Sequence, residues 1–165
     1  MKEKILHYFK EIVFFILFIT LFANILSIYK SQEITANKLP NLPMRLIDNS
    51  LYKPHLNRPL VVHIWATWCP TCKMEIDNIE RIAKNYDTIT IAVKSGSDYE
   101  IENFLKSNNL SLKVINDRDG SLAQKFHIPA FPTTLIYNKK GELVFSEVGY
   151  TSTFGLYLRI WWASL

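Results

Sequence analysis

Two cysteines separated by two residues are the side chains of this 165-residue chain that point most directly to chemistry. Cys69 and Cys72 lie in the stretch WATWCPTCK, residues 65–73, and no other cysteine is present. A structural crosslink is the weakest interpretation, because a bridge over two intervening residues closes too small a loop to stabilise much. A structural zinc site needs about four ligands, and the chain has four histidines isolated from one another: His7, His55, His63 and His127. We therefore favour disulfide exchange.

The residues after Cys69 give the two cysteines different environments. Apolar residues recur at gaps of four and three, as on one face of a helix: Cys72, Ile76, Ile79, Ala83 and Tyr86. Pro70 suits the first helical position, where an N–H has no partner. Cys69 then lies at the helix amino terminus, where free amides and the helix dipole lower a thiol pKa. We expect Cys69 to be the attacking sulfur and Cys72, one turn deeper, to resolve the mixed disulfide.

Strands and helices alternate around this segment. Continuous apolar runs over 60–66 and 88–93 are typical of strands buried on both faces. The other predicted elements are a short strand over 44–47, helices over 98–109, 121–127 and 152–165, a strand over 112–117, and a hairpin of strands 133–138 and 143–150. This order predicts a three-layer α/β domain with a mixed sheet.

The amino-terminal segment contains an apolar run from Ile12 to Tyr29, interrupted only by Thr20, Asn24 and Ser27. At about 1.5 Å per residue, this run reaches roughly 27 Å, close to the hydrocarbon thickness of a bilayer. A cleaved signal peptide is the alternative, but its apolar part is normally shorter and ends in a small-x-small site, which residues 23–25 do not provide. We therefore expect an uncleaved transmembrane anchor.

Charge sets the orientation expected for this anchor. Three lysines precede the apolar run and only Lys30 follows it immediately, which keeps the amino terminus in the cytoplasm. The predicted division is a cytoplasmic segment 1–11, an anchor 12–29, a polar linker 30–39 and a domain 40–165. The net charge of +4 is mild and contains no long basic run, so we expect no nucleic-acid partner.

Two stretches resemble a known family. Residues 65–73 resemble the active site of the thioredoxin superfamily. FHIPAFPTTLIYNKKGEL, residues 126–143, resembles its second signature, in which a proline before a threonine takes the cis form; Pro132 and Thr133 stand at those positions. The anchor, the linker and Glu75 resemble the extracytoplasmic TlpA/ResA/DsbE branch, and residues 147–165 look most like its membrane-tethered ScsD (suppressor of copper sensitivity) group. The resemblance implies a thioredoxin-like three-layer α/β/α fold with a mixed central sheet, preceded by one transmembrane helix.

The resemblance also implies roles for residues. Cys69 and Cys72 are the expected catalytic pair, and an acid at the position of Glu75 is implicated in proton transfer near them. The alternative for Glu75 is an ordinary first-turn glutamate favoured by the helix dipole. His63 stands where thioredoxin carries a buried acid, and the alternative is a core histidine satisfied by a hydrogen bond. The expected substrate-binding residues are Trp68, Pro70, Thr71, Phe131 and Pro132.

The favoured function is a membrane-anchored thiol–disulfide oxidoreductase that exchanges disulfides with cysteines of exported proteins through the CPTC motif. We expect it in a bacterial inner membrane with its domain in the periplasm. A membrane or periplasmic redox partner resets the dithiol, and neither a metal nor a cofactor is expected beyond the redox-active pair. The alternative is a copper-binding or copper-tolerance module, in which the thiolates and a histidine such as His127 or His63 hold Cu(I). The two residues between the cysteines, Pro70 and Thr71, do not indicate whether the protein oxidises or reduces its partners.

Overall fold

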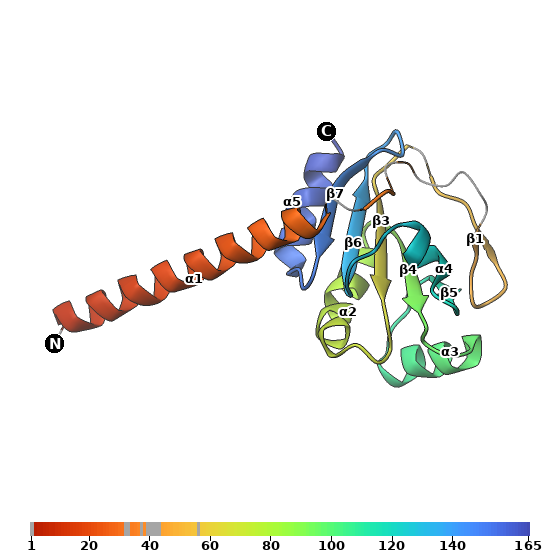
Figure 1. Cartoon of the computed structure of the whole chain (residues 1–165), viewed down its shortest axis with the longest axis horizontal. Coiled ribbons are helices and arrows are strands. Elements are labelled where there is room, and N and C mark those ends of the chain that lie inside the picture. Colours follow the sequence, from red (N-terminus) through yellow and green to blue (C-terminus); the bar gives the residue numbers. More distant parts are fainter. Residues whose placement is uncertain (1, 32–33, 37, 39–43, 56) are drawn as a thin grey trace.

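A computed structural model describes residues 2–31, 34–36, 38, 44–55 and 57–165, and it places a long helix beside one α/β domain (Figure 1). The strands are β1 (Met44–Arg45), β2 (Leu51–Tyr52), β3 (Leu60–Trp65), β4 (Asp87–Val93), β5 (Val114–Asp117), β6 (Thr133–Tyr137) and β7 (Leu143–Val148). The helices are α1 (Lys2–Ser31), α2 (Pro70–Ala83), α3 (Asp98–Ser107), α4 (Ser121–Lys125) and α5 (Thr153–Ala163).

The main sheet has the strand order β5-β4-β3-β6-β7. β3, β4 and β5 are parallel, whereas β6 runs antiparallel to β3 and β7 antiparallel to β6, so the sheet is mixed as predicted. β3 lies in the centre, and all six of its residues are buried, which explains its continuous apolar sequence.

The topology brings two distant segments to one edge of the sheet. β3 ends at Trp65, and the cysteines follow it directly. Because β6 is antiparallel to β3 and Thr133 pairs with Ile64, the residues that precede Thr133 lie beside the end of β3. The predicted second signature therefore lies next to the first.

Two apolar clusters cover the two faces of the sheet. One cluster joins β3 residues Val61 and Trp65 to side chains of α2, α3 and α5. The other joins Val62 and Ile64 to Ala123 of α4 and to Ile34 and Ala36 near the amino-terminal helix. The predicted three layers, with a sheet between helical layers, are confirmed.

A small hairpin, β1 paired with β2, was not predicted. The predicted strand over 44–47 is only two residues long, and a turn at 48–50 joins it to its partner. The side chain of Asp48 accepts hydrogen bonds from the N–H and hydroxyl of Ser50, and Asn49 takes a positive φ of 68°. Asparagine tolerates that conformation better than most residues, so the turn chemistry was present in the sequence.

Helix α1 ends beside β7 (Figure 1). It exposes apolar side chains, including those of Phe14, Phe18 and Phe22. Among the described residues, no helix combines the length and the apolar character needed to cross a bilayer. The expected transmembrane anchor over 12–29 is therefore not supported by this helix. The expected linker over 30–39 lies partly outside the described residues; within it, Ile34 and Ala36 are buried.

Candidate active site

The two cysteines form a disulfide at the start of α2, with a Cα–Cα distance of 5.3 Å. Cys69 is the N-cap residue in an extended conformation, with φ −86° and ψ 115°, and Pro70 begins the helix. This is the placement that the proline and the apolar stripe predict. Cys69 is 6% exposed and Cys72 is fully buried. The sulfur of Cys69 is thus the one that another molecule can reach.

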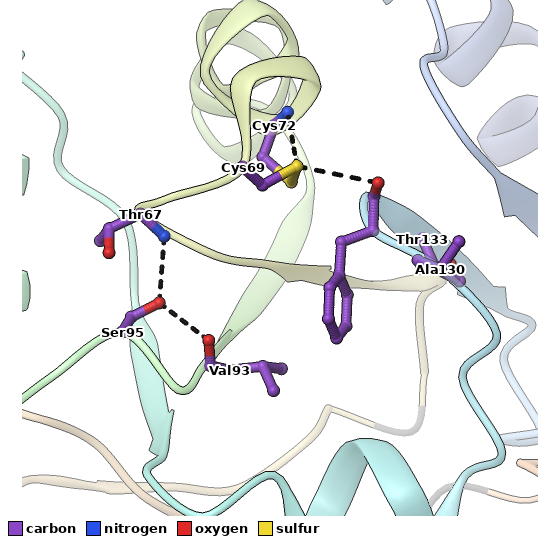
Figure 2. The surroundings of a disulfide bond; sticks show 8 residues. Thr67, Cys69, Cys72, Val93, Ser95, Ala130 and Thr133 are labelled. Atoms are coloured by element: carbon purple, nitrogen blue, oxygen red, sulfur yellow. Dashed lines mark hydrogen bonds between the residues drawn. A yellow bond between two sulfur atoms is a disulfide. The ribbon is translucent and has the colours of Figure 1, made fainter.

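Two backbone groups approach the sulfur of Cys69 (Figure 2). The N–H of Cys72 donates to this sulfur at 3.2 Å, a hydrogen bond that favours a thiolate once the disulfide is opened. The carbonyl oxygen of Phe131 lies 3.7 Å from the same sulfur. A disulfide sulfur carries no hydrogen, so this second contact becomes a hydrogen bond only when Cys69 is a protonated thiol.

The residues expected to bind substrate differ in exposure around this sulfur. Trp68, Pro70 and Thr71 are exposed, Phe131 is half-buried and Pro132 is buried. The rings of Trp68 and Phe131 meet edge to face, with centroids 6.0 Å apart. Among the described residues, the Phe131–Pro132 peptide bond alone is cis, as predicted. The structure therefore brings Trp68 and Phe131 together next to Cys69.

The loop before Cys69 is fixed by the turn after β4, which the sequence analysis missed. The hydroxyl of Ser95 accepts a hydrogen bond from the N–H of Thr67 at 3.0 Å and donates to the carbonyl of Val93 at 3.0 Å (Figure 2). The indole N–H of Trp68 donates to the carbonyl of Lys94 at 3.1 Å. A signal was available: Ser95 follows a parallel strand next to β3, and such strand ends share one edge.

Glu75 lies one turn after Cys72 on the buried side of α2, with no exposed surface. Within the part of the chain that the structure describes, neither carboxylate oxygen has a hydrogen-bond partner. Burial raises the pKa of this carboxyl to about 8; the backbone of Thr151 opposes the rise, and the charge of Glu147 adds to it. The Thr151 backbone is thus close to Glu75 without reaching hydrogen-bonding geometry. The first turn of α2 contains no acidic residue, and a solvated glutamate would be exposed, so the structure does not support the interpretation as an ordinary first-turn glutamate.

His63 is fully buried in the centre of β3. Its Nδ1 lies 2.9 Å from the hydroxyl of Thr134, while its Nε2 has no partner. Burial lowers the pKa of the imidazole to about 3, so the ring is neutral. One of the two ring nitrogens is therefore hydrogen-bonded. The interpretation of His63 as a core histidine satisfied by a hydrogen bond holds for Nδ1 but not for Nε2.

Among the described residues, no group of three or more His, Cys, Asp and Glu side chains is placed to hold a metal ion. His127 binds instead to the hydroxyl of Thr35, 2.9 Å from its Nδ1, and His55 to Asp87, 3.2 Å from its Nδ1. The copper-binding alternative thus has no supporting cluster in this part of the chain.

Comparisons with known proteins place the chain among redox proteins. A family model described as Redoxin matches residues 30–155. A thioredoxin-like protein of Haemophilus influenzae is 30% identical over 108 residues, which are 65% of this chain and 64% of that protein. Sporulation thiol-disulfide oxidoreductase A of Bacillus subtilis is 26% identical over 58% of this chain and 62% of its own length. The chain thus spans less than two thirds of each of these relatives.

The fold agrees with a solved structure. The crystal structure of StoA from Bacillus subtilis matches with a TM-score of 0.62 and 24% sequence identity, and the match covers 73% of this chain and 98% of that one. At this identity the likeness concerns the fold alone. The thioredoxin-like α/β fold with a mixed central sheet is confirmed, whereas the finer resemblance to the ScsD group stays a prediction.

Proposed function

Because the chain belongs to the Redoxin family, we propose that it is a thiol–disulfide oxidoreductase that works through Cys69 and Cys72. The observation that carries this proposal is the asymmetry of the pair. Cys69 caps a helix amino terminus and accepts an N–H hydrogen bond, whereas Cys72 is fully buried one turn deeper. Helix termini of this kind lower the pKa of a cysteine and favour its thiolate.

The exchange proceeds in two steps. A thiolate of the partner attacks the sulfur of Cys69, a mixed disulfide forms, and Cys72 leaves as a thiolate that takes up a proton. A second partner thiolate then attacks the partner sulfur of the mixed disulfide, and Cys69 leaves. The partner dithiol loses two electrons and two protons, and the disulfide of this chain gains them. The reverse direction uses the same two steps.

Glu75 is the proposed proton donor and acceptor for Cys72. It lies one helical turn from Cys72 on the same buried side, and both side chains are shielded from bulk solvent. With its pKa raised to about 8 by burial, the carboxyl can give a proton to a thiolate near neutral pH and take it back.

The proposed substrates are exported proteins with cysteines, which would lie across Trp68, Pro70, Thr71, Phe131 and Pro132. Trp68 presents an exposed aromatic surface beside the reactive sulfur. A proline has no N–H, so the backbone next to Cys69 offers carbonyl acceptors to an extended segment of the substrate. A membrane or periplasmic partner would reset the pair, because oxidising compartments do not keep a dithiol reduced.

We further propose that residues 12–29 attach the chain to a bacterial inner membrane as a single-pass anchor, with the domain in the periplasm. The support is the apolar run with lysines before it, together with the exposed apolar side chains of α1. Extraction of membranes with alkaline carbonate should leave the chain in the pellet, and external protease should digest the domain in spheroplasts. Release by carbonate would exclude the anchor.

Reduction of insulin by dithiothreitol tests the enzymatic proposal. The full chain in detergent should accelerate the reaction, Cys69→Ser should abolish the acceleration, and Cys72→Ser should accumulate a mixed disulfide visible on a non-reducing gel. Tight binding of one Cu(I) by the reduced chain without any acceleration would favour the copper-binding alternative.

A further inference from the structure

Buried polar atoms without partners are concentrated in the layer of the domain that holds Cys72. Six such side-chain atoms occur among the described residues, and four of them belong to His63, Trp65 and Glu75. Trp65 packs in the same apolar cluster as Cys72. Since alternate residues of a strand point to one face, His63 faces this layer too. Glu75 enters the layer from the buried side of α2.

A row of polar residues crosses the sheet beneath this layer. His63 of β3 pairs in register with Thr90 of β4 and with Thr134 of β6. Thr134 pairs in turn with Glu147 of β7, whose carboxylate accepts a hydrogen bond from Arg159 of α5 at 2.6 Å. Both threonines and the histidine are fully buried. The floor of the layer is therefore polar across four strands.

Buried polar groups in folded proteins almost always have a partner, and ordered water supplies it where the protein does not. A buried water typically makes about three hydrogen bonds. The two oxygens of Glu75, the Nε2 of His63 and the indole N–H of Trp65 are four such groups within one layer, enough for one buried water. Buried groups of this composition require a polar partner, and an internal water molecule can supply it.

We propose that an internal water bridges Glu75 to His63, and that His63 is a positioning residue whose Nε2–H stabilises the Glu75 carboxylate after this has given its proton to Cys72. The hydroxyl of Thr134 selects the tautomer. In the proposed arrangement this hydroxyl donates to Nδ1, which is 2.9 Å away, and the imidazole proton is on Nε2, directed away from Thr134. This inference rests on the proposed function for the step that it serves.

The proton balance is simple. Cys72 leaves as a thiolate and takes the proton of the Glu75 carboxyl, so one S–H bond forms and one O–H bond breaks. The carboxylate that remains is buried and requires donors, which the water and the imidazole supply. When the disulfide forms again, Cys72 returns the proton to Glu75. The imidazole stays neutral throughout, which agrees with the burial that lowers its pKa.

The other charged groups of the layer compensate one another. The titratable or charged groups that face it are Cys72 and Glu75 of α2, His63 of β3, Glu147 of β7, and Arg159 and Tyr157 of α5, with Tyr86 after the end of α2. Glu147 pairs with Arg159, and the ring of Tyr86 packs against that of Tyr157. Burial is the main cause of the raised pKa of Glu75, with smaller effects from the Thr151 backbone and the charge of Glu147.

The decisive measurement is the titration of Glu75 in the full chain, labelled with ¹³C at glutamate carboxyls and reconstituted in detergent micelles. In the reduced protein, His63→Phe should raise the pKa of the Glu75 carboxyl by about one unit, and Thr134→Val should shift it in the same direction by less. Thr90→Val, which removes a buried hydroxyl on the other side of His63, is the matched control and should shift it little. Glu75→Gln identifies the signal.

Two further readouts separate the possible failures. NMR detection of a long-lived water near the Glu75 carboxyl should succeed in the wild type and fail in His63→Phe. Insulin reduction at pH 7 should slow about tenfold in His63→Phe, less than the 10²–10⁴-fold typical of removing a general acid.

An unchanged Glu75 titration in both His63→Phe and Thr134→Val would overturn the inference while leaving the proposed function intact. Absence of insulin reduction in the wild type would overturn the proposed function, and the titration would still test the bridge. If His63→Phe does not fold, His63→Leu, which also removes the N–H donor, replaces it.

Discussion

The carbonyl oxygen of Phe131 lies 3.7 Å from the sulfur of Cys69, on a different side from the N–H of Cys72 that donates to it. The acceptor stabilises a protonated thiol and the donor stabilises a thiolate. The residue after Phe131 is a proline, so no backbone N–H from that position competes for the sulfur. The helix amino terminus, with its free N–H groups, favours the thiolate over the protonated thiol.

Alkylation should therefore distinguish the two cysteines. In the reduced full chain, Cys69 should react with iodoacetamide with an apparent pKa below the free-thiol value of about 8.5, because the N–H of Cys72 and the start of α2 favour its charged form. Cys72 should stay unreactive until the protein unfolds, since it is fully buried. Peptide mass spectrometry at graded pH measures both rates, and the two single-serine variants are the controls. Equal rates would contradict the asymmetry.

Replacing Glu75 by glutamine should make the protein more stable toward alkaline pH. The folded pKa of about 8 lies above the ordinary value of 4.5, so this group stabilises the fold fully below pH 4.5 and loses that contribution as the pH rises toward 8. The wild type should lose on the order of 4 kcal/mol relative to Glu75→Gln across this interval. Urea denaturation at pH 5 and pH 8 measures the difference.

The control for this titration is Glu102→Gln, which removes one carboxylate from the exposed side of α3. If the free energy of unfolding of the wild type did not fall relative to that of Glu75→Gln between the two pH values, Glu75 would have to be exposed to bulk water. The proposed proton transfer would then lose its buried donor.

Ser95→Ala should loosen the loop that carries Cys69. The N–H of Thr67 loses the hydroxyl that accepts its hydrogen bond, at a cost of about 1–2 kcal/mol. Amide hydrogen exchange should accelerate at Thr67, and insulin reduction should slow. Ser107→Ala, at the exposed end of α3, is the matched control. If exchange at Thr67 stayed as slow as in the wild type, another group would have to hold this loop.

Arg159→Met should destabilise the domain by about 2 kcal/mol, because Glu147 loses a guanidinium partner in a mostly buried position. The side chain of Glu147 is 15% exposed and that of Arg159 is 22% exposed. Lys106→Met breaks an exposed ion pair with Glu102 on α3 and should change stability by less than about 0.5 kcal/mol. Thermal denaturation compares the two, and similar effects would contradict the assigned burial.

Local chemistry explains which features the sequence predicted. The start of α2 depends on Pro70 and on an apolar stripe within a few residues of it, so both cysteines could be placed. The central strands are buried on both faces and read as unbroken apolar runs. The hairpin of β6 and β7 follows from two strand-like runs around a turn that ends in Gly141.

Features that depend on tertiary packing could not be predicted. Ser95 supports Thr67 from 28 residues away. Its place after β4 indicates the edge of the sheet at which it lies, but the contact with Thr67 depends on how the two loops pack. The sequence of α2 suggests an exposed position for Glu75, yet tertiary packing buries this side chain completely. The pairing of His63 with Thr134 depends on strand register across 71 residues, which the sequence of either strand leaves open.

Thr35 attaches the start of the domain to the end of α4 and to the residue that follows it. Its N–H donates to the carbonyl of Phe126, and its hydroxyl donates to the carbonyl of Lys125. Thr35 is only four positions after Ser31, the last residue of α1. With α1 held in a membrane as proposed, the short separation between α1 and Thr35 would limit the distance of Cys69 from the lipid surface. A redox partner in the same membrane would then meet it by lateral diffusion, and only a partner whose cysteines stand at a matching height could react.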